Sequence, residues 1–172
     1  MSRFASMTRS PIAIALVAIL AVSGCATKKN NLPNNAGDLG LNGANGAGGA
    51  PGSTQDFTVN VGDRIFFDTD SSVVRADAQA TLGKQAQWLQ QYPNYAITVE
   101  GHADERGTRE YNIALGARRA AATRDFLASS GVPAGRMKTI SYGKERPVAV
   151  CDDISCWSQN RRAVTVLGGA GS

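Results

Sequence analysis

Two charged features in the middle of the chain have the residue types and spacing of a binding site. The first is the polar segment from His102 to Thr108, HADERGT, which holds two acids and one arginine between a predicted strand and a predicted helix. Ligands collect at the carboxyl ends of strands, where helix N-termini offer free N–H groups. The turn therefore predicts a site for a carboxylate-bearing ligand. The alternative is a solvated turn whose acids cap the helix.

The second feature is Arg119, which helical periodicity sets beside an apolar stripe. At about 100° per residue, Leu115, Ala122 and Phe126 point within a narrow arc. Arg119 lies within about 40° of that arc. A guanidinium there needs a carboxylate from the protein or from a ligand, because an unpaired charge at such a site is costly. The alternative is an arginine that covers the core with its stem and reaches water with its head.

The elements that must position these groups alternate between strand and helix. We expect a strand at 57–67, a helix from about 74 that Pro93 stops, a strand at 95–99, a helix at 109–129 closed by Gly131, and strands at 137–142 and 162–167. Crossover helices place consecutive strands in parallel, and the closing strand can add antiparallel. The pattern predicts an α/β sandwich in the order β-α-β-α-β-β, with two helices on one face of a mixed four-stranded sheet.

The N-terminal third differs in composition from this domain. Residues 1–24 carry Arg3 and Arg9, an apolar run of about a dozen residues and a small-residue end, which is typical of a secretory signal. The run is too short to span a bilayer, which takes roughly 20 residues. The segment around Cys25 resembles the lipobox of bacterial lipoproteins, in which the cysteine is lipidated. We interpret residues 25–55 as the lipidated cysteine and a flexible tether rich in Asn, Gly and Ala. Residues 56–172 are then expected to form one globular domain.

Charge and cysteine content exclude several classes of protein. The formal net charge of +4 over 172 residues is too small and too scattered to indicate nucleic-acid binding. Cys151 and Cys156 flank a short loop and, in an exported chain, favour a disulfide over a metal site, because His102 is the only histidine. No catalytic triad can be assembled. His102 beside Asp104 and Glu105 leaves a cell-wall hydrolase as the enzymatic alternative, which the neighbouring arginines disfavour because they hold the acids ionised.

Several ordered motifs resemble a known family. GHADERGT at 101–108, YNIALGARRA at 111–120, SYG at 141–143 and NRRAV at 160–164 resemble the peptidoglycan-associated lipoproteins of Gram-negative envelopes, over residues 65–167. The resemblance implies an OmpA-like domain that holds meso-diaminopimelate of the peptidoglycan stem peptide without chemistry and without a cofactor. It implies that Asp104 and Arg119 grip this zwitterion.

The same resemblance assigns further residues. It puts Phe67 and Asp68 at the mouth of the pocket and Asn112 and Leu115 on its wall, with one arginine of the pair 161–162 nearby. Phe67 as plain core is an equal alternative. The resemblance also implies an outer-membrane lipoprotein, palmitoylated and anchored through Cys25, whose periplasmic domain works in the Tol-Pal system during cell division. TolB and other Tol proteins are then expected partners, and the alternative function is an interaction module whose main ligand is TolB.

Overall fold

The structure, a computed structural model, describes residues 49–168. The expected signal segment, Cys25 and most of the expected tether lie outside the described residues. Within 49–168, no helix combines the length and the apolar character needed to cross a membrane.

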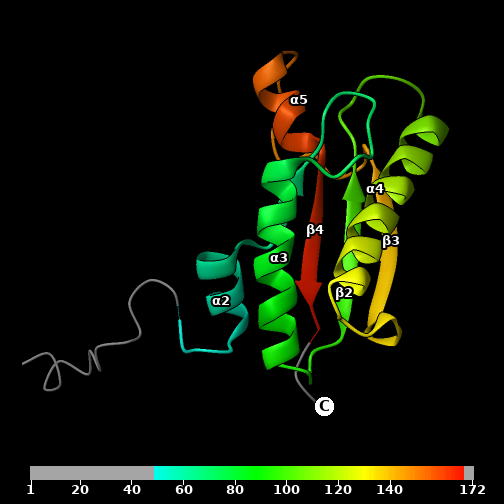
Figure 1. The fold of residues 1–172 in the computed structure, drawn as a ribbon. Helices are drawn as coiled ribbons and strands as arrows, with labels where there is room; N and C mark the ends of the chain where they lie inside the picture. The colour runs from blue at the N-terminus through cyan, green and yellow to red at the C-terminus, as the bar shows by residue number, and fades with distance from the viewer. Residues whose placement is uncertain (1–48, 169–172) are drawn as a thin grey trace, which may run out of the picture. The chain divides into compact units, whose positions relative to one another are not determined.

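One mixed sheet of four strands forms the centre of the domain, in the order β1-β4-β2-β3 (Figure 1). The strands are β1 (Arg64–Phe66), β2 (Ile97–His102), β3 (Met137–Gly143) and β4 (Arg162–Leu167). β2 and β3 run parallel, whereas β4 pairs antiparallel with both β1 and β2. Ala163 of β4 therefore lies between Ile65 and Gly101 of its two neighbours.

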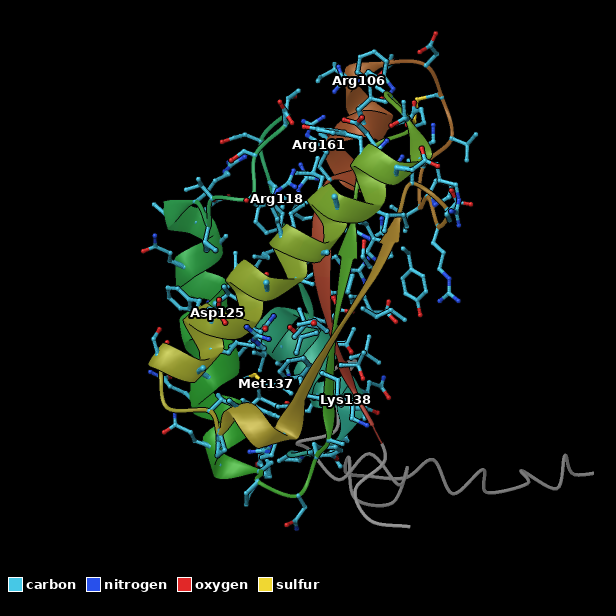
Figure 2. The ribbon with its side chains drawn as sticks, turned by 90° about the vertical axis from the view of Figure 1, so that its right-hand side faces the viewer. Arg106, Arg118, Asp125, Met137, Lys138 and Arg161 are labelled. Carbon is cyan, nitrogen blue, oxygen red and sulfur yellow. A yellow bond between two sulfur atoms is a disulfide. The ribbon has the colours of Figure 1, made fainter. Side chains whose placement is uncertain are left out.

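Two long helices pack on one face of this sheet. They are α3 (Ala76–Gln91) and α4 (Arg109–Ser129); a 3-10 turn, η2 (Ala134–Arg136), precedes β3. Figure 2 shows the helices on one side of the strands, which confirms the predicted sandwich. A further helix, α5 (Ile154–Asn160), lies beyond one end of the sheet, within a segment expected to be a loop.

Small residues bring α4 against β2. A Cβ atom built on Gly101 would lie 1.8 Å from the carbonyl oxygen of Gly116, so strand and helix meet backbone to backbone. The helix begins after Thr108, whose Oγ1 accepts a hydrogen bond from the backbone N of Tyr111 at 3.2 Å. Residues near the start of α4 consequently lie over the carboxyl end of β2, where the polar turn begins.

The expected strand at 57–67 is wrong over its first half. One helical turn, α2 (Thr54–Asp56), runs into a π-helical turn, η1 (Phe57–Gly62), and only Arg64–Phe66 is strand. Phe57 is buried against the indole of Trp88, with ring centroids 4.9 Å apart, and the Asp56 carboxylate accepts from Trp88 Nε1 at 2.8 Å. These contacts with α3 outweigh the β propensity of the segment. The helix starts just before the boundary expected at residue 56.

Candidate functional site

A cavity of about 270 Å³ opens where the β2–α4 turn, the start of α4 and the segment after β1 meet. It lies at the end of the domain where Figure 2 labels Arg106. The lining residues come from all three elements and include two acids and two arginines: Thr69, Asp70, Asp104, Arg106, Gly107, Tyr111, Asn112, Leu115 and Arg119. Asp104 and Arg119, the two residues expected to grip a ligand, therefore line the same cavity.

Arg119 is a fully buried cation at the floor of this cavity, with 0% of its surface exposed. In the part of the chain that the structure describes, its guanidinium donates only to carbonyl oxygens: Nε to Ser71 at 2.8 Å, Nη1 to His102 at 2.8 Å and Nη2 to Asp68 at 3.0 Å. Burial lowers the pKa of Arg119 to about 10, with the charge of Asp104 opposing, so the group is cationic at neutral pH. Three of the five N–H donors of a guanidinium are used, and two remain for an anion.

The position of Arg119 differs from the prediction. It was expected at the edge of the apolar stripe, but it lies within the buried face of α4, between Gly116 and Thr123, whereas Ala122 and Phe126 are only half-buried. The reason is the contact of Gly116 with the backbone of β2, which decides the face of α4 that turns inward. Hydropathy alone does not report such a contact.

Asp104 supplies a negative charge to the cavity that Arg119 also lines, and its side chain is 10% exposed. Arg106 Nη2 donates to Oδ2 at 2.7 Å and Arg106 Nε to Oδ1 at 3.2 Å, while Arg161 Nη1 donates to Oδ2 at 3.3 Å. Burial alone would raise the pKa of Asp104, but the hydrogen bonds and charge of Arg106, with the hydrogen bond of Arg161, outweigh it and hold the pKa below its usual value. Asp104 is therefore ionised at neutral pH.

Of the two arginines at 161 and 162, Arg161 is the one that reaches the site. Arg162 turns to the other side of the sheet, where its Nη2 donates to the carbonyl oxygen of Arg146 at 3.1 Å. The His102 imidazole lies near Arg146, because it packs on Tyr142 with ring centroids 5.5 Å apart and the Arg146 guanidinium lies over the same Tyr142 ring. Burial, followed by the charges of Arg162 and Arg146, lowers the pKa of His102 to about 4. The His102 imidazole does not line the cavity, although the carbonyl oxygen of His102 holds Arg119.

The other predicted residues divide into two groups. Asn112 and Leu115 line the cavity, and Asn112 Nδ2 donates to the carbonyl oxygen of Arg106 at 2.7 Å. The side chains of Phe67 and Asp68 do not line it. Phe67 is 1% exposed and lies under the guanidinium of Arg119, 5.2 Å from ring centroid to Cζ, which is the core position left open as the alternative. The Asp68 carboxylate is exposed and pairs with Arg75 instead.

Sequence reasoning placed the start of the segment after β1 at the pocket but missed Thr69 and Asp70, which are the residues of this segment that line the cavity. Asp70 has a positive φ of 53°, and its carboxylate accepts a hydrogen bond from the hydroxyl of Tyr111 in the first turn of α4. The only available signal was the position of Tyr111 on the exposed side of that helix. The carbonyl groups of Asp68 and Ser71 in the same segment cover Arg119.

A second layer of contacts supports the β2–α4 turn from outside. The indole of Trp157 in α5 packs on the guanidinium of Arg106, 4.1 Å from ring centroid to Cζ, and its Nε1 donates to the Glu105 carboxylate. Lys144 Nζ donates to the carbonyl oxygen of Gly107 at 2.8 Å. A disulfide joins Cys151 to Cys156, just before Trp157. Among residues 49–168, no three His, Cys, Asp or Glu side chains gather as a metal site would require.

Comparison with known proteins identifies the relatives of this chain. The model of the OmpA family matches residues 66–161. The peptidoglycan-associated lipoprotein of Mesorhizobium japonicum is 76% identical over 172 residues, covering 100% of both chains. That of Brucella melitensis is 78% identical over 171 residues, covering 99% of each. A crystal structure of the peptidoglycan-associated lipoprotein from Burkholderia pseudomallei matches with a TM-score of 0.60 and 45% identity, over 62% of this chain and 90% of that one.

Proposed function

We propose that this chain, which belongs to the OmpA family, binds peptidoglycan non-covalently by holding meso-diaminopimelate in the cavity between Asp104 and Arg119. The protein would thereby fasten the outer membrane to the cell wall. Its relatives carry the name of a lipoprotein and not of an enzyme, and the site works by binding alone.

The observation that carries this proposal is the buried charge of Arg119, which within residues 49–168 meets carbonyl oxygens but no carboxylate. Carbonyl dipoles compensate a buried cation only in part, so an anionic ligand is favoured there. The free end of meso-diaminopimelate bears one carboxylate and one ammonium on the same carbon. The carboxylate suits the two remaining donors of Arg119, and the ammonium suits Asp104.

Access to Arg119 requires a movement of the segment after β1. Because Arg119 is fully covered, a ligand carboxylate reaches the two remaining donors of its guanidinium only after a local movement of the segment that carries the carbonyl groups of Asp68 and Ser71. The hydrogen bond between Tyr111 and Asp70 holds this segment to α4 and is the contact that has to yield. Each charge-assisted hydrogen bond to the ligand would contribute about 1.5–3 kcal/mol, and the movement offsets part of that.

Attachment to the membrane is the second half of the proposal. Cys25 would carry the lipid and residues 26–55 would tether the domain, which leaves the binding site in the periplasm. Two or more acyl chains anchor a protein stably, whereas one holds it only reversibly. In this arrangement the chain would act in the Tol-Pal system with TolB and other Tol proteins as partners, and would support envelope integrity and cell division.

Sedimentation with purified peptidoglycan tests the binding site. We expect Asp104→Asn and Arg119→Lys to remain in the supernatant while their circular dichroism stays that of the wild type. Asp125→Asn is the matched control, because Asp125 is an exposed acid of α4 that pairs with Arg124. This variant should sediment with peptidoglycan as the wild type does. Normal sedimentation of both site variants would remove this cavity from the function.

Two further measurements separate the parts of the proposal. A stem peptide with lysine in place of diaminopimelate lacks the terminal carboxylate, so it should bind far more weakly than the diaminopimelate peptide in a titration. Equal binding of the two peptides would contradict the role of Arg119. Cys25→Ala should release the protein from membranes, and continued membrane retention would contradict the lipid anchor.

A further inference from the structure

The carboxylate of Asp104 has no acceptor position left for a ligand in this structure. Besides the two side-chain bonds from Arg106 and the one from Arg161, the backbone N of Arg106 donates to Oδ1 at 3.3 Å. An ionised carboxylate offers about four lone-pair positions, and these four hydrogen bonds occupy them. An ammonium group that binds Asp104 must therefore replace one of the present donors.

We infer that Arg106 is a specificity-determining residue. Its guanidinium occupies the position on the Asp104 carboxylate that the ligand's ammonium group would bind, and only a ligand that carries such a cation displaces it. The inference rests on the proposed function and deepens it. It concerns the part of the site that recognises the ammonium, and it is independent of how Arg119 meets the carboxylate.

Exposure distinguishes Arg106 from the other cation on Asp104. The side chain of Arg106 is 41% exposed, whereas that of Arg161 is 8% exposed and also donates through Nε to the carbonyl oxygen of Phe67. Arg161 is therefore the fixed counter-charge, and Arg106 is the donor that can swing toward solvent. Its main chain stays in place during this movement, because Asn112 holds the carbonyl oxygen of Arg106.

Trp157 gives the displaced guanidinium a second contact. The indole faces Arg106 at 4.1 Å and is itself held by the Glu105 carboxylate. A cation over an indole ring is stabilised without any carboxylate. Arg106 can thus exchange its bonds to Asp104 for water and keep its contact with Trp157, which lowers the cost of leaving.

The exchange explains how the site would select its ligand. When an ammonium replaces Arg106, Asp104 keeps two cationic neighbours and its charge stays compensated. A dicarboxylic ligand without the ammonium leaves Arg106 in place and gains nothing from Asp104. The competition lowers the affinity for the correct ligand as well, since Arg106 must be displaced each time.

Titration calorimetry with two synthetic stem peptides tests this inference on the full chain in detergent. One peptide ends in meso-diaminopimelate, and the other carries the same residue with hydrogen in place of the distal ammonium. We expect Arg106→Ala to bind the diaminopimelate peptide about tenfold more tightly than the wild type, which corresponds to about 1.4 kcal/mol. The affinity for the peptide without the ammonium should not change.

Arg124→Ala is the control for the loss of one positive charge. Arg124 pairs with Asp125, which Figure 2 shows farther along α4 from Arg106, so this variant should bind both peptides as the wild type does. Trp157 supplies a second readout, because its fluorescence reports the guanidinium that lies on it. The emission should change when the diaminopimelate peptide binds the wild type, because the guanidinium that stays on the indole exchanges the Asp104 carboxylate for water, and this change should be absent in Arg106→Ala.

The possible results separate this inference from the proposed function. Weaker binding of both peptides by Arg106→Ala would make Arg106 a direct ligand contact and overturn the inference. An unchanged affinity for the diaminopimelate peptide would overturn it too, provided that Asp104→Asn abolishes binding and so keeps the proposed site. If Asp104→Asn binds as the wild type does, the proposed function itself fails.

Discussion

Replacing Gly101 by alanine tests the close approach of β2 and α4, on which the whole site depends. A Cβ at position 101 would lie 1.8 Å from the carbonyl oxygen of Gly116 and 2.7 Å from its carbonyl carbon. The obstacle is backbone and cannot rotate away as a side chain would. The helix must therefore move outward by more than about 1 Å to restore normal contact.

The cost of that movement follows from the contacts that cross the interface. Ser141 Oγ donates to the carbonyl oxygen of Ile113 at 2.7 Å, and Arg119 Nη1 donates to that of His102 at 2.8 Å. Both hydrogen bonds would stretch. Overpacking a core costs about 1–3 kcal/mol, and each weakened hydrogen bond adds about 1 kcal/mol. We therefore expect Gly101→Ala to lower the free energy of unfolding by about 3–5 kcal/mol and to weaken peptidoglycan binding.

Gly83→Ala is the matched control, since Gly83 lies within α3 and no atom lies within 4 Å of a Cβ built there. Alanine in an open helical position stabilises by about 0.5–1 kcal/mol. Urea unfolding followed by circular dichroism should thus move the two midpoints in opposite directions. A Gly101→Ala protein as stable as the wild type would refute the backbone contact.

Three further changes have expected results of their own. The pKa of His102 lies at about 4 in the folded protein, below its unfolded value, so the unfolded chain binds more protons between about pH 4 and 6.5. The free energy of unfolding should therefore fall by up to about 3 kcal/mol as the pH drops through this window. In urea titrations, His102→Gln should remove this pH dependence. Thr108→Ala should cost about 1 kcal/mol in thermal unfolding, because the N-cap of α4 is lost; no change would contradict the cap. Replacing Cys151 and Cys156 together by serine should cost about 2 kcal/mol in urea unfolding by the chain-entropy estimate, and equal stability would show that the bridge constrains nothing.

The sequence was most informative where a pattern is local. Periodicity and end signals located α3, α4 and the strands on either side of them, because caps and helical spacing act within a few residues. Local reasoning failed at Phe57–Gly62, where a segment rich in β-branched and aromatic residues forms a helical turn. Its aromatic contact with Trp88 spans about thirty positions of the chain, and no local pattern reports it.

The sequence predicted the charged residues of the candidate site but not the groups that surround and hold them. The motifs singled out Asp104 and Arg119, and both line one cavity. Their partners could not be predicted from spacing. Arg119 donates to carbonyl groups of a distant loop, and Arg106 is supported by Trp157 from a helix that was expected to be a loop. Main-chain acceptors and stacking partners depend on the tertiary path of the chain, which one sequence leaves undetermined.

The strand order β1-β4-β2-β3 has a consequence for the biogenesis of this protein. The position next to β1 in the sheet is taken by β4, which is the last strand of the chain to be synthesised. Until Arg162–Leu167 emerges, β1 has no partner in the sheet and one edge of β2 is bare. Chains that lack this strand should therefore be sensitive to proteases, and truncation before Arg162 should yield degraded product instead of a shorter folded domain.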